Sequence, residues 1–296
     1  MSAKNLMVYG MVILSMLFWS MTYIWYKNVF TVLNPITVMT FRLGLSALFL
    51  LTFSKLIGKL QMPVKTDFFW FLALSFFQPF IYFLAESYGV SMVSATISAV
   101  IISTIPIFIS IVAHVFLNNK MSKLNIIGIM LSFIGVLMVI LGKTLHFNGS
   151  IKGVLLLFIA VLSTIGYSII IVKLINKYNS FTIISWQNII GALLFVPLFF
   201  IVDFEHFKQA EITQPIIINL IYLALLGSSA AYIFFTYAIK NLGVAKASLF
   251  SNLIPIFTAI FSYYMINEVL TGFKIIGIFI VILGLFMGQI KPKLSK

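Results

Sequence analysis

Residues 105–138 read IPIFISIVAHVFLNNKMSKLNIIGIMLSFIGVLM, and residues 254–287 read IPIFTAIFSYYMINEVLTGFKIIGIFIVILGLFM. The two stretches align without gaps at an offset of 149 residues. Chance matches of isoleucine are common in apolar sequence, so the significant matches are Pro106 with Pro255, Asn118 with Asn267, Gly128 with Gly277 and Gly135 with Gly284. The seven-residue glycine spacing predicts close helix packing. We therefore divide the chain into two related halves, residues 1–145 and 146–296.

The composition indicates a membrane protein. Of the 296 residues, 62% are hydrophobic and 8% are charged, whereas soluble proteins carry roughly 25% charged residues. A spanning helix needs about 20 apolar residues. Continuous apolar runs predict an all-α bundle of ten transmembrane helices, near Leu6–Tyr26, Pro35–Ser54, Phe68–Gly89, Ser94–Leu117, Leu124–Leu141, Gly153–Val172, Thr182–Val202, Pro215–Ile239, Ala245–Ile266 and Phe273–Gln289.

Each half contains five of these spans, and an odd number makes the second half enter the membrane from the opposite side. The sequence therefore predicts two inverted five-helix repeats. Alternate sets of termini and connections contain thirteen and five lysines. The positive-inside rule then places both termini in the cytoplasm. We expect a multi-pass protein of a bacterial-type inner membrane.

The sequence indicates no cofactor, metal or nucleic-acid partner. Cysteine is absent, and the three histidines, His114, His146 and His206, lie in different segments. The net charge of +13 comes from lysines between apolar runs, which suits anionic lipid head groups and a bilayer rather than nucleic acid. Gly142-Lys143-Thr144 lacks the earlier glycine of a phosphate-binding loop. No machinery for nucleotide hydrolysis is therefore expected.

Short motifs in both halves resemble the EamA-type branch of the drug/metabolite transporter superfamily. They are Trp19-Ser20, Lys27, Phe41-Arg42-Leu43, Pro106-Ile107-Phe108, Pro255-Ile256-Phe257, Asn267-Glu268 and the helix with Gly277 and Gly284. The resemblance covers nearly the whole chain. It implies ten helices in two inverted repeats and export or uptake of small polar metabolites. One departure is Asn119, where family members often carry an acidic residue; Glu268, its counterpart in the second half, we expect to be a cap or surface residue.

The third span carries the strongest candidate for a functional site. Glu86 is the only carboxylate inside a predicted span, and an ionisable group at membrane depth is a functional-site hypothesis. Gln78, Tyr82 and Glu86 recur every four residues on one helical face, and Pro79 predicts a kink. Arg42 in the second span reaches a similar depth, so we expect an ion pair with Glu86. The alternatives are that this pair is only a structural strut, or that Glu86 is interfacial.

Four further residues are candidates for contact with a substrate. Trp19 and Trp186 either line the site or belong to an interfacial aromatic belt. Gln187 occupies the position in the second half that Arg42 occupies in the first, which would make the lining asymmetric. Asn252 precedes Pro255 and either repairs the helix break or contacts substrate.

These observations favour a secondary transporter, an exporter of small polar or amphipathic metabolites such as amino acids or related compounds. It would work by alternating access as a monomer or homodimer, driven by a proton or an exchanged solute. The alternatives are an integral membrane enzyme and a channel or receptor. Metal-dependent membrane enzymes need histidine clusters or paired carboxylates, so we do not expect enzymatic activity.

Overall fold

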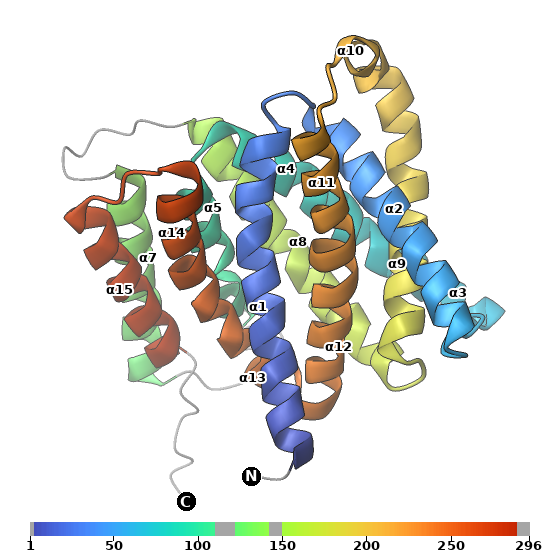
Figure 1. Cartoon of the computed structure of the whole chain (residues 1–296). Coiled ribbons are helices and arrows are strands. Elements are labelled where there is room, and N and C mark those ends of the chain that lie inside the picture. The colour runs from blue at the N-terminus through green and yellow to red at the C-terminus, as the bar shows by residue number, and fades with distance from the viewer. Residues whose placement is uncertain (1–2, 110–121, 142–149, 289–296) are drawn as a thin grey trace, which may run out of the picture.

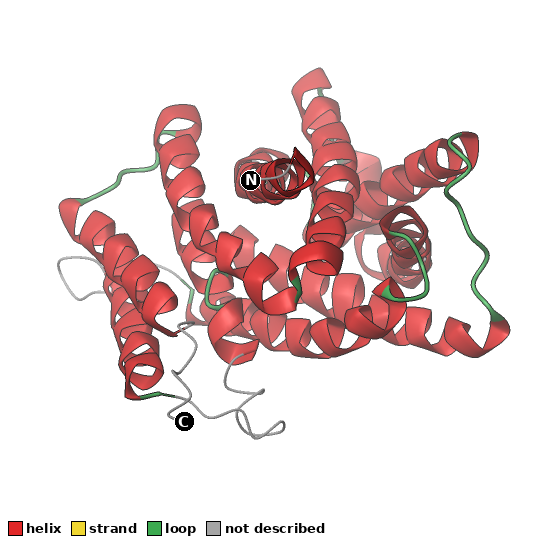
Figure 2. Ribbon diagram, turned by 90° about the horizontal axis from the view of Figure 1, so that it is seen from below, coloured by secondary structure: helices red, strands yellow, loops and turns green. Residues whose placement is uncertain are grey.

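The computed structural model describes residues 3–109, 122–141 and 150–288 (Figure 1). All regular structure in these residues is helical, and Figure 2 shows helices joined by loops without a strand in the part described. The predicted all-α class is therefore confirmed for these residues.

In the first half, the helices of the bundle begin close to their predicted positions. They are α1 (Ala3–Val29), α2 (Pro35–Leu56), α3 (Lys65–Ser75), the π-helical segment η1 (Phe76–Ile81), α4 (Tyr82–Met92), α5 (Ala95–Ile102) and α7 (Lys123–Leu141). After α5, a turn precedes further helical residues at 105–109.

The second half repeats this order. Its elements are α8 (Ile151–Ile175), α9 (Ser180–Leu198), the π-helical segment η2 (Phe199–Asp203), α10 (Phe204–Gln209), α11 (Gln214–Tyr222), the π-helical segment η3 (Leu223–Ala230), α12 (Ala231–Leu242), α13 (Val244–Ser248), the 3₁₀ segment η4 (Leu249–Leu253), α14 (Ile254–Ile266) and α15 (Gly272–Gly288).

Eight of these helical stretches are long and apolar enough to cross a membrane. The other two predicted spans correspond to the shorter apolar helices Ala95–Ile109 and Gly272–Gly288, each of which ends where the described residues end. Large apolar side chains such as Phe279 and Phe286 are 68% and 57% exposed on the outer surface, which suits contact with lipid. The count of ten spans and their inverted arrangement stay predictions.

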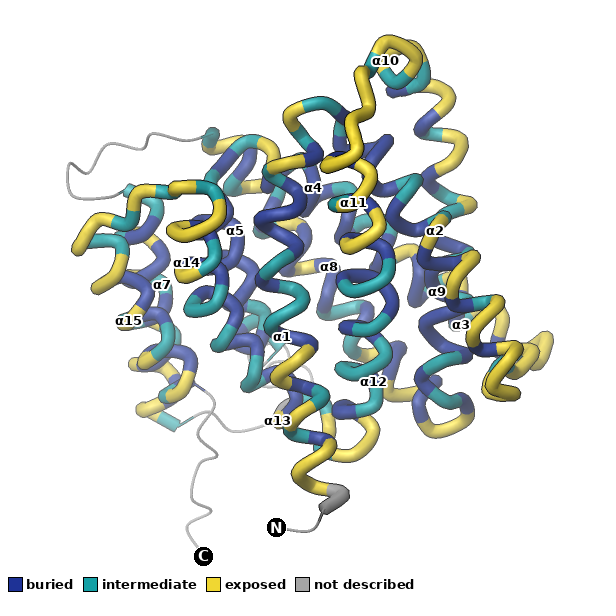
Figure 3. Tube along the Cα trace, viewed as in Figure 1, coloured by how far each residue is buried: buried dark blue, intermediate teal, exposed yellow. Residues whose placement is uncertain are grey.

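The helices of the two halves pack in matching pairs. Helix α1 packs against α12 and α14, and its counterpart α8 packs against α4 and α5. The counterparts α2 and α9 contact each other, as do α7 and α15. Helix α1 begins and α15 ends at the same end of the bundle, the lower end in Figure 1. All eight residues of α5 are buried, and Figure 3 shows buried residues in the helices at the centre of the bundle.

Hydrogen bonds join the two halves near the starts of α2 and α9. Asp203 of the second half accepts hydrogen bonds from the backbone N–H and the hydroxyl group of Thr37, near the start of α2, over 2.9 and 3.0 Å. Thr182, near the start of α9, accepts a 3.0 Å hydrogen bond from the backbone N–H of Gln61. The bond from Thr37 occupies a backbone N–H group at the start of α2, where such groups lack partners within the helix.

Glycines allow α7 and α15 to approach within backbone contact. A Cβ atom on Gly128 would lie 2.3 Å from the backbone nitrogen of Gly288, and one on Gly284 would lie 2.4 Å from that of Ser132. Any side chain at these positions would therefore force the helices apart. This is the close packing that the glycine spacing predicts.

Candidate functional site

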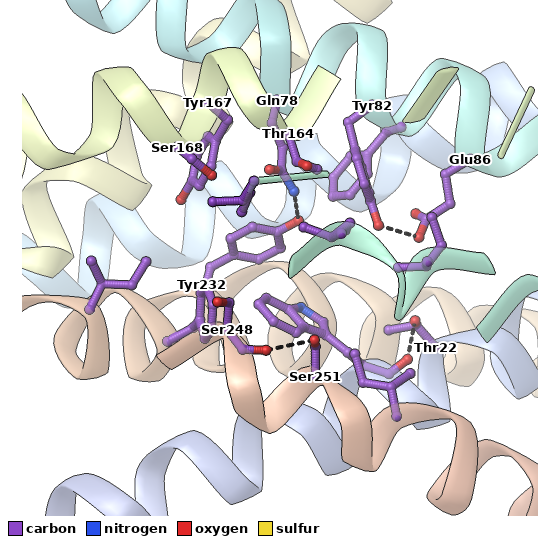
Figure 4. A pocket seen from close by; sticks show the side chains of 18 of the residues that line it. Thr22, Gln78, Tyr82, Glu86, Thr164, Tyr167, Ser168, Tyr232, Ser248 and Ser251 are labelled. Atoms are coloured by element: carbon purple, nitrogen blue, oxygen red, sulfur yellow. Dashed lines mark hydrogen bonds between the residues drawn. The ribbon is translucent and has the colours of Figure 1, made fainter. Parts of the chain in front are cut away.

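A cavity lies between the two halves and contains about 810 Å³ of space that protein atoms do not fill. All the charged residues among the described lining come from the first half. The second half contributes hydroxyl, aromatic and aliphatic side chains (Figure 4), including Thr164, Tyr167, Ser168, Tyr232, Phe235, Ser248 and Ser251.

A helix break between α3 and α4 shapes one wall of this cavity. Gln78 has non-helical backbone angles, with φ −148° and ψ 117°, and the next residue, Pro79, has no N–H to continue the helix. The Pro79 ring packs against Gly191 of α9, where a Cβ atom would lie 2.3 Å from Pro79 Cγ. Gln78 Nε2 then donates a 2.5 Å hydrogen bond to the hydroxyl oxygen of Tyr232. The predicted kink is present, but Gln78 does not share a continuous helical face with Tyr82 and Glu86.

Two more breaks lie at matching positions of the repeat. In the first half, a turn at Ser103 and Thr104 precedes Pro106. In the second half, the 3₁₀ segment η4 precedes Pro255. Residues on both sides of each break line the cavity: Ile102 and Ile105 in the first half, and Ser248 and Ile254 in the second.

Glu86 is 5% exposed and is surrounded by phenol groups. The hydroxyl groups of Tyr82 and Tyr23 donate to its Oε1 atom over 2.8 and 3.4 Å, and that of Tyr26 donates to Oε2 over 3.5 Å. A buried carboxylate needs such partners. Figure 4 shows the Tyr82 hydroxyl directed at the carboxylate.

Arg42 is 1% exposed. Its Nε donates to Ser228 Oγ over 2.5 Å, and its Nη1 donates to the hydroxyl oxygen of Tyr26. The guanidinium carbon lies 4.2 Å from the ring centre of Phe83 and 5.3 Å from that of Tyr26. Arg42 and Glu86 are not among the ion pairs of the described residues. The direct ion pair expected from the sequence is therefore replaced by a link through Tyr26.

Of the eight site residues predicted from the sequence, five line the cavity: Trp19, Arg42, Gln78, Tyr82 and Glu86. The Trp19 ring lies 5.1 Å from that of Tyr232, and its Nε1 donates to the carbonyl oxygen of Gly227 over 3.3 Å. The structure thus brings the candidates of the first half together.

The other three candidates lie outside the cavity lining. Trp186 donates from Nε1 to the carbonyl oxygen of Gln61 over 3.1 Å. Gln187 is 1% exposed, and its Oε1 has no partner among the described residues. Asn252 is 2% exposed and follows Ser251, which lines the cavity. Neither polar atom of its side chain has a hydrogen-bond partner in the part described, so Asn252 does not repair the break before Pro255.

Sequence reasoning missed Tyr26 and Ser228, which hold Arg42 in place. A signal for Tyr26 exists, because Trp19, Tyr23 and Tyr26 follow the spacing of one helical face. Ser228 lies in the run Gly227-Ser228-Ser229 inside an apolar span. The described residues contain no cluster of three histidine, aspartate or glutamate residues that could hold a metal ion.

The two halves contact each other at the end of the bundle where α4 ends and α5 begins. Glu268 Oε2 accepts a 3.3 Å hydrogen bond from the backbone N–H of Thr96, near the start of α5. Glu268 therefore acts as a cap, one of the two roles expected for it. The hydroxyl groups of Thr96 and Ser262 lie 3.1 Å apart. Within the first half, Lys27 Nζ donates to the carbonyl oxygen of Val90 over 2.6 Å at the same end.

Comparisons with known proteins agree with this architecture. The sequence profile of the EamA-like transporter family matches residues 6–141 and 151–288. An uncharacterized transporter of Archaeoglobus fulgidus is 24% identical over 94% of this chain and 96% of its own length. The uncharacterized transporter YyaM of Bacillus subtilis is 27% identical over 95% of this chain and 93% of its own length.

Two further matches are more distant. A chloroplastic WAT1-related protein of Arabidopsis thaliana is 24% identical over 91% of this chain and 66% of its own length. A protein of known crystal structure is 10% identical and superposes with a TM-score of 0.71, over 98% of this chain and 99% of that chain. This last likeness shows a shared fold.

Proposed function

Since the chain belongs to the EamA-like transporter family, we propose that it is a secondary transporter that exports small amphipathic metabolites through the cavity between its halves. The observation that carries this proposal is the cavity itself. It is lined by both halves and combines one buried cation and one buried carboxylate with aromatic and aliphatic side chains. Such a lining suits amino acids or related compounds with a compact polar group on an apolar body.

Alternating access is supported by the arrangement of the two halves. Their counterpart helices have matching contact partners, and the breaks before Pro106 and Pro255 occupy equivalent positions beside the cavity. Interrupted helices at matching positions of two repeats are typical of transporters with inverted repeats. We therefore propose ten spans in two inverted repeats of five, with the breaks as the points where the halves rearrange.

The side from which the cavity is reached is inferred from its lining. Its lining reaches Val244 and Ser248 of α13, and α13 lies at the lower end of the bundle, where α1 begins (Figure 1). The lysine distribution assigns this end to the cytoplasm. At the upper end, Glu268, Thr96 and Ser262 join the halves. In this conformation a substrate would reach the cavity from the cytoplasm. For the export that we propose, across an inner membrane, it would leave by the upper end after the halves rearrange.

Transport would be driven by a proton gradient or by an exchanged solute. Glu86 is the only carboxylate among the described lining residues, so it is the candidate for proton exchange. Glu86→Gln should then abolish transport against a gradient and leave exchange intact at saturating substrate concentration. Exchange requires only that the loaded carrier reorient.

Counterflow in proteoliposomes tests the proposed function. Vesicles are loaded with one unlabelled compound from a panel of amino acids, amines, nucleobases and vitamins, and entry of the labelled compound is followed. We expect saturable entry that is stimulated by the loaded compound.

Labelling with a bulky maleimide tests whether substrate passes through the cavity. The label on Ser168→Cys, in the cavity lining, should block counterflow, whereas the same label on exposed Ser91→Cys should not. Entry that rises linearly with concentration would indicate a channel, and no counterflow with any compound would contradict the proposal.

A further inference from the structure

The part of the cavity around Glu86 contains hydrogen-bond acceptors that no described residue uses. Tyr23 and Tyr82 each donate their hydroxyl proton to Glu86 Oε1. A phenol has one proton and can also accept, and neither hydroxyl oxygen accepts a hydrogen bond from a described residue. Because each hydroxyl donates to a carboxylate, its oxygen is polarised and becomes a better acceptor. Both hydroxyl groups meet the same oxygen atom of Glu86, so one small donor group can contact both.

Arg42 is largely unavailable to a ligand. Its Nε and Nη1 atoms donate to Ser228 and Tyr26, and the rings of Phe83 and Tyr26 lie against its guanidinium group. A Cβ atom on Gly227 would lie 3.3 Å from Nη2, so the backbone of η3 lies close to the remaining nitrogen. A carboxylate on a ligand would have to displace these partners.

Arg42 and the hydroxyl oxygens of Tyr23 and Tyr82 are linked to different oxygen atoms of Glu86. Oε2 meets Tyr26, which binds Arg42, whereas Oε1 meets Tyr23 and Tyr82. A second cation at Tyr23 and Tyr82 would therefore be linked to Oε1, whereas Arg42 is linked to Oε2 through Tyr26. Aromatic rings continue the wall, with Trp19 5.1 Å from Tyr232 and 4.9 Å from Phe235 between ring centres.

We propose that the cavity binds a primary amine in its ammonium form, attached to an aromatic or similarly bulky apolar body. Tyr23 and Tyr82 accept hydrogen bonds from the ammonium group, and the Glu86 carboxylate, to which both hydroxyl groups donate, polarises their oxygen atoms toward it. The rings of Trp19, Tyr232 and Phe235 contact the apolar body, and aromatic faces near a cation add a favourable cation–π interaction. This inference deepens the proposed function, since it names the ligand class of the same cavity, but binding can be measured without transport.

Three probes with nearly the same body test the proposal: 2-phenylethylamine, 2-phenylethanol and 3-phenylpropionate. Their affinities are measured by calorimetry on the purified full-length protein. We expect the amine to bind about tenfold more tightly than the other two, as cation–π contacts and charge-assisted hydrogen bonds of ordinary strength would give. Glu86→Gln and Tyr82→Phe should each weaken binding of the amine about tenfold and leave the alcohol unchanged. Tyr88→Phe on the same helix is the matched control, because Tyr88 does not line the cavity.

The comparison among probes on the unaltered protein does not depend on whether a variant folds. Tighter binding of 3-phenylpropionate would overturn the proposal and make Arg42 the ligand-binding group. Equal binding of amine and alcohol, an amine preference that survives Glu86→Gln, or no binding of any probe would also overturn it. Tight amine binding without counterflow of any compound would contradict the proposed transport function and leave this inference standing.

Discussion

Arg42 donates a hydrogen bond to the hydroxyl oxygen of Tyr26, and the same hydroxyl group lies 3.5 Å from Oε2 of Glu86. The two buried charges of the cavity are therefore connected through a neutral phenol and not by direct contact. This arrangement keeps Oε1 of Glu86 free to bind Tyr23 and Tyr82. A direct ion pair would draw the carboxylate toward Arg42 and away from Tyr23 and Tyr82.

Tyr26→Phe should destabilise the protein by about 1–3 kcal/mol, because it removes a partner from two buried charged groups. Thermal unfolding in detergent measures this. Tyr9→Phe is the control on the same helix, since the Tyr9 hydroxyl makes no hydrogen bond to a described residue. The double variant Tyr26→Phe with Glu86→Gln should lose less free energy of unfolding than the sum of the losses in the single variants, as expected for coupled residues. Strict additivity would show that Tyr26 does not link the two.

Gly128→Ala should lower the unfolding temperature, because the added Cβ atom would lie 2.3 Å from the backbone of Gly288. Overpacking of this kind typically costs about 1–3 kcal/mol. Gly44→Ala is the matched control in α2, where an added Cβ atom meets nothing within 4 Å. Equal unfolding temperatures for the two variants would contradict the close contact between α7 and α15.

Sequence patterns predict the features of this protein that depend on local chemistry. Glycine spacing predicted the packing of Gly128 against α15, and Pro79 predicted the break in the third span. Both follow from a backbone property of the residue itself. Apolar runs likewise predicted the helices of the bundle.

The sequence does not determine which neighbour a buried side chain contacts. Gln187 matches Arg42 in the alignment of the halves, yet only Arg42 lines the cavity. The direct pairing of Arg42 with Glu86 was wrong because Tyr26, from a third helix, lies between them. Gln78 was placed on the face of Tyr82 by its spacing, but Pro79 ends that helical register. Such contacts depend on how three or more helices pack.

Lys177 provides a test of the structure outside the membrane. Its Nζ donates to the two carboxylate oxygens of Asp67 over 2.8 and 3.0 Å, and this hydrogen bonding raises the pKa of Lys177 above its ordinary value. The stabilisation is therefore present below the ordinary lysine pKa and is lost as the pH rises through the raised value. At pH near 9, Lys177 should be acylated more slowly than exposed Lys55, as mass spectrometry would show. Asp67→Asn should accelerate acylation of Lys177 only; an unchanged rate would contradict the pairing.

The orientation of the bundle can be tested by labelling, because the chain contains no cysteine. Single cysteines at Lys59 and Lys177 should react with an impermeant maleimide only from the cytoplasmic side. Cysteines at Lys152 and Lys208 should react only from outside. Labelling of Lys59→Cys and Lys208→Cys from the same side would contradict the inverted arrangement of the two halves.

The most direct test of the account is whether one position in the cavity is reached alternately from the two sides of the membrane. Ser168→Cys is labelled with an impermeant maleimide in vesicles of both orientations, with and without an added cysteine pair at Thr96 and Ser262, whose hydroxyl groups lie 3.1 Å apart. We predict labelling from both sides in the unlocked protein. Oxidation of the pair should abolish counterflow and labelling from outside while labelling from the cytoplasm persists. Labelling from only one side in the unlocked protein, or outside labelling that survives the lock, would contradict alternating access through this cavity.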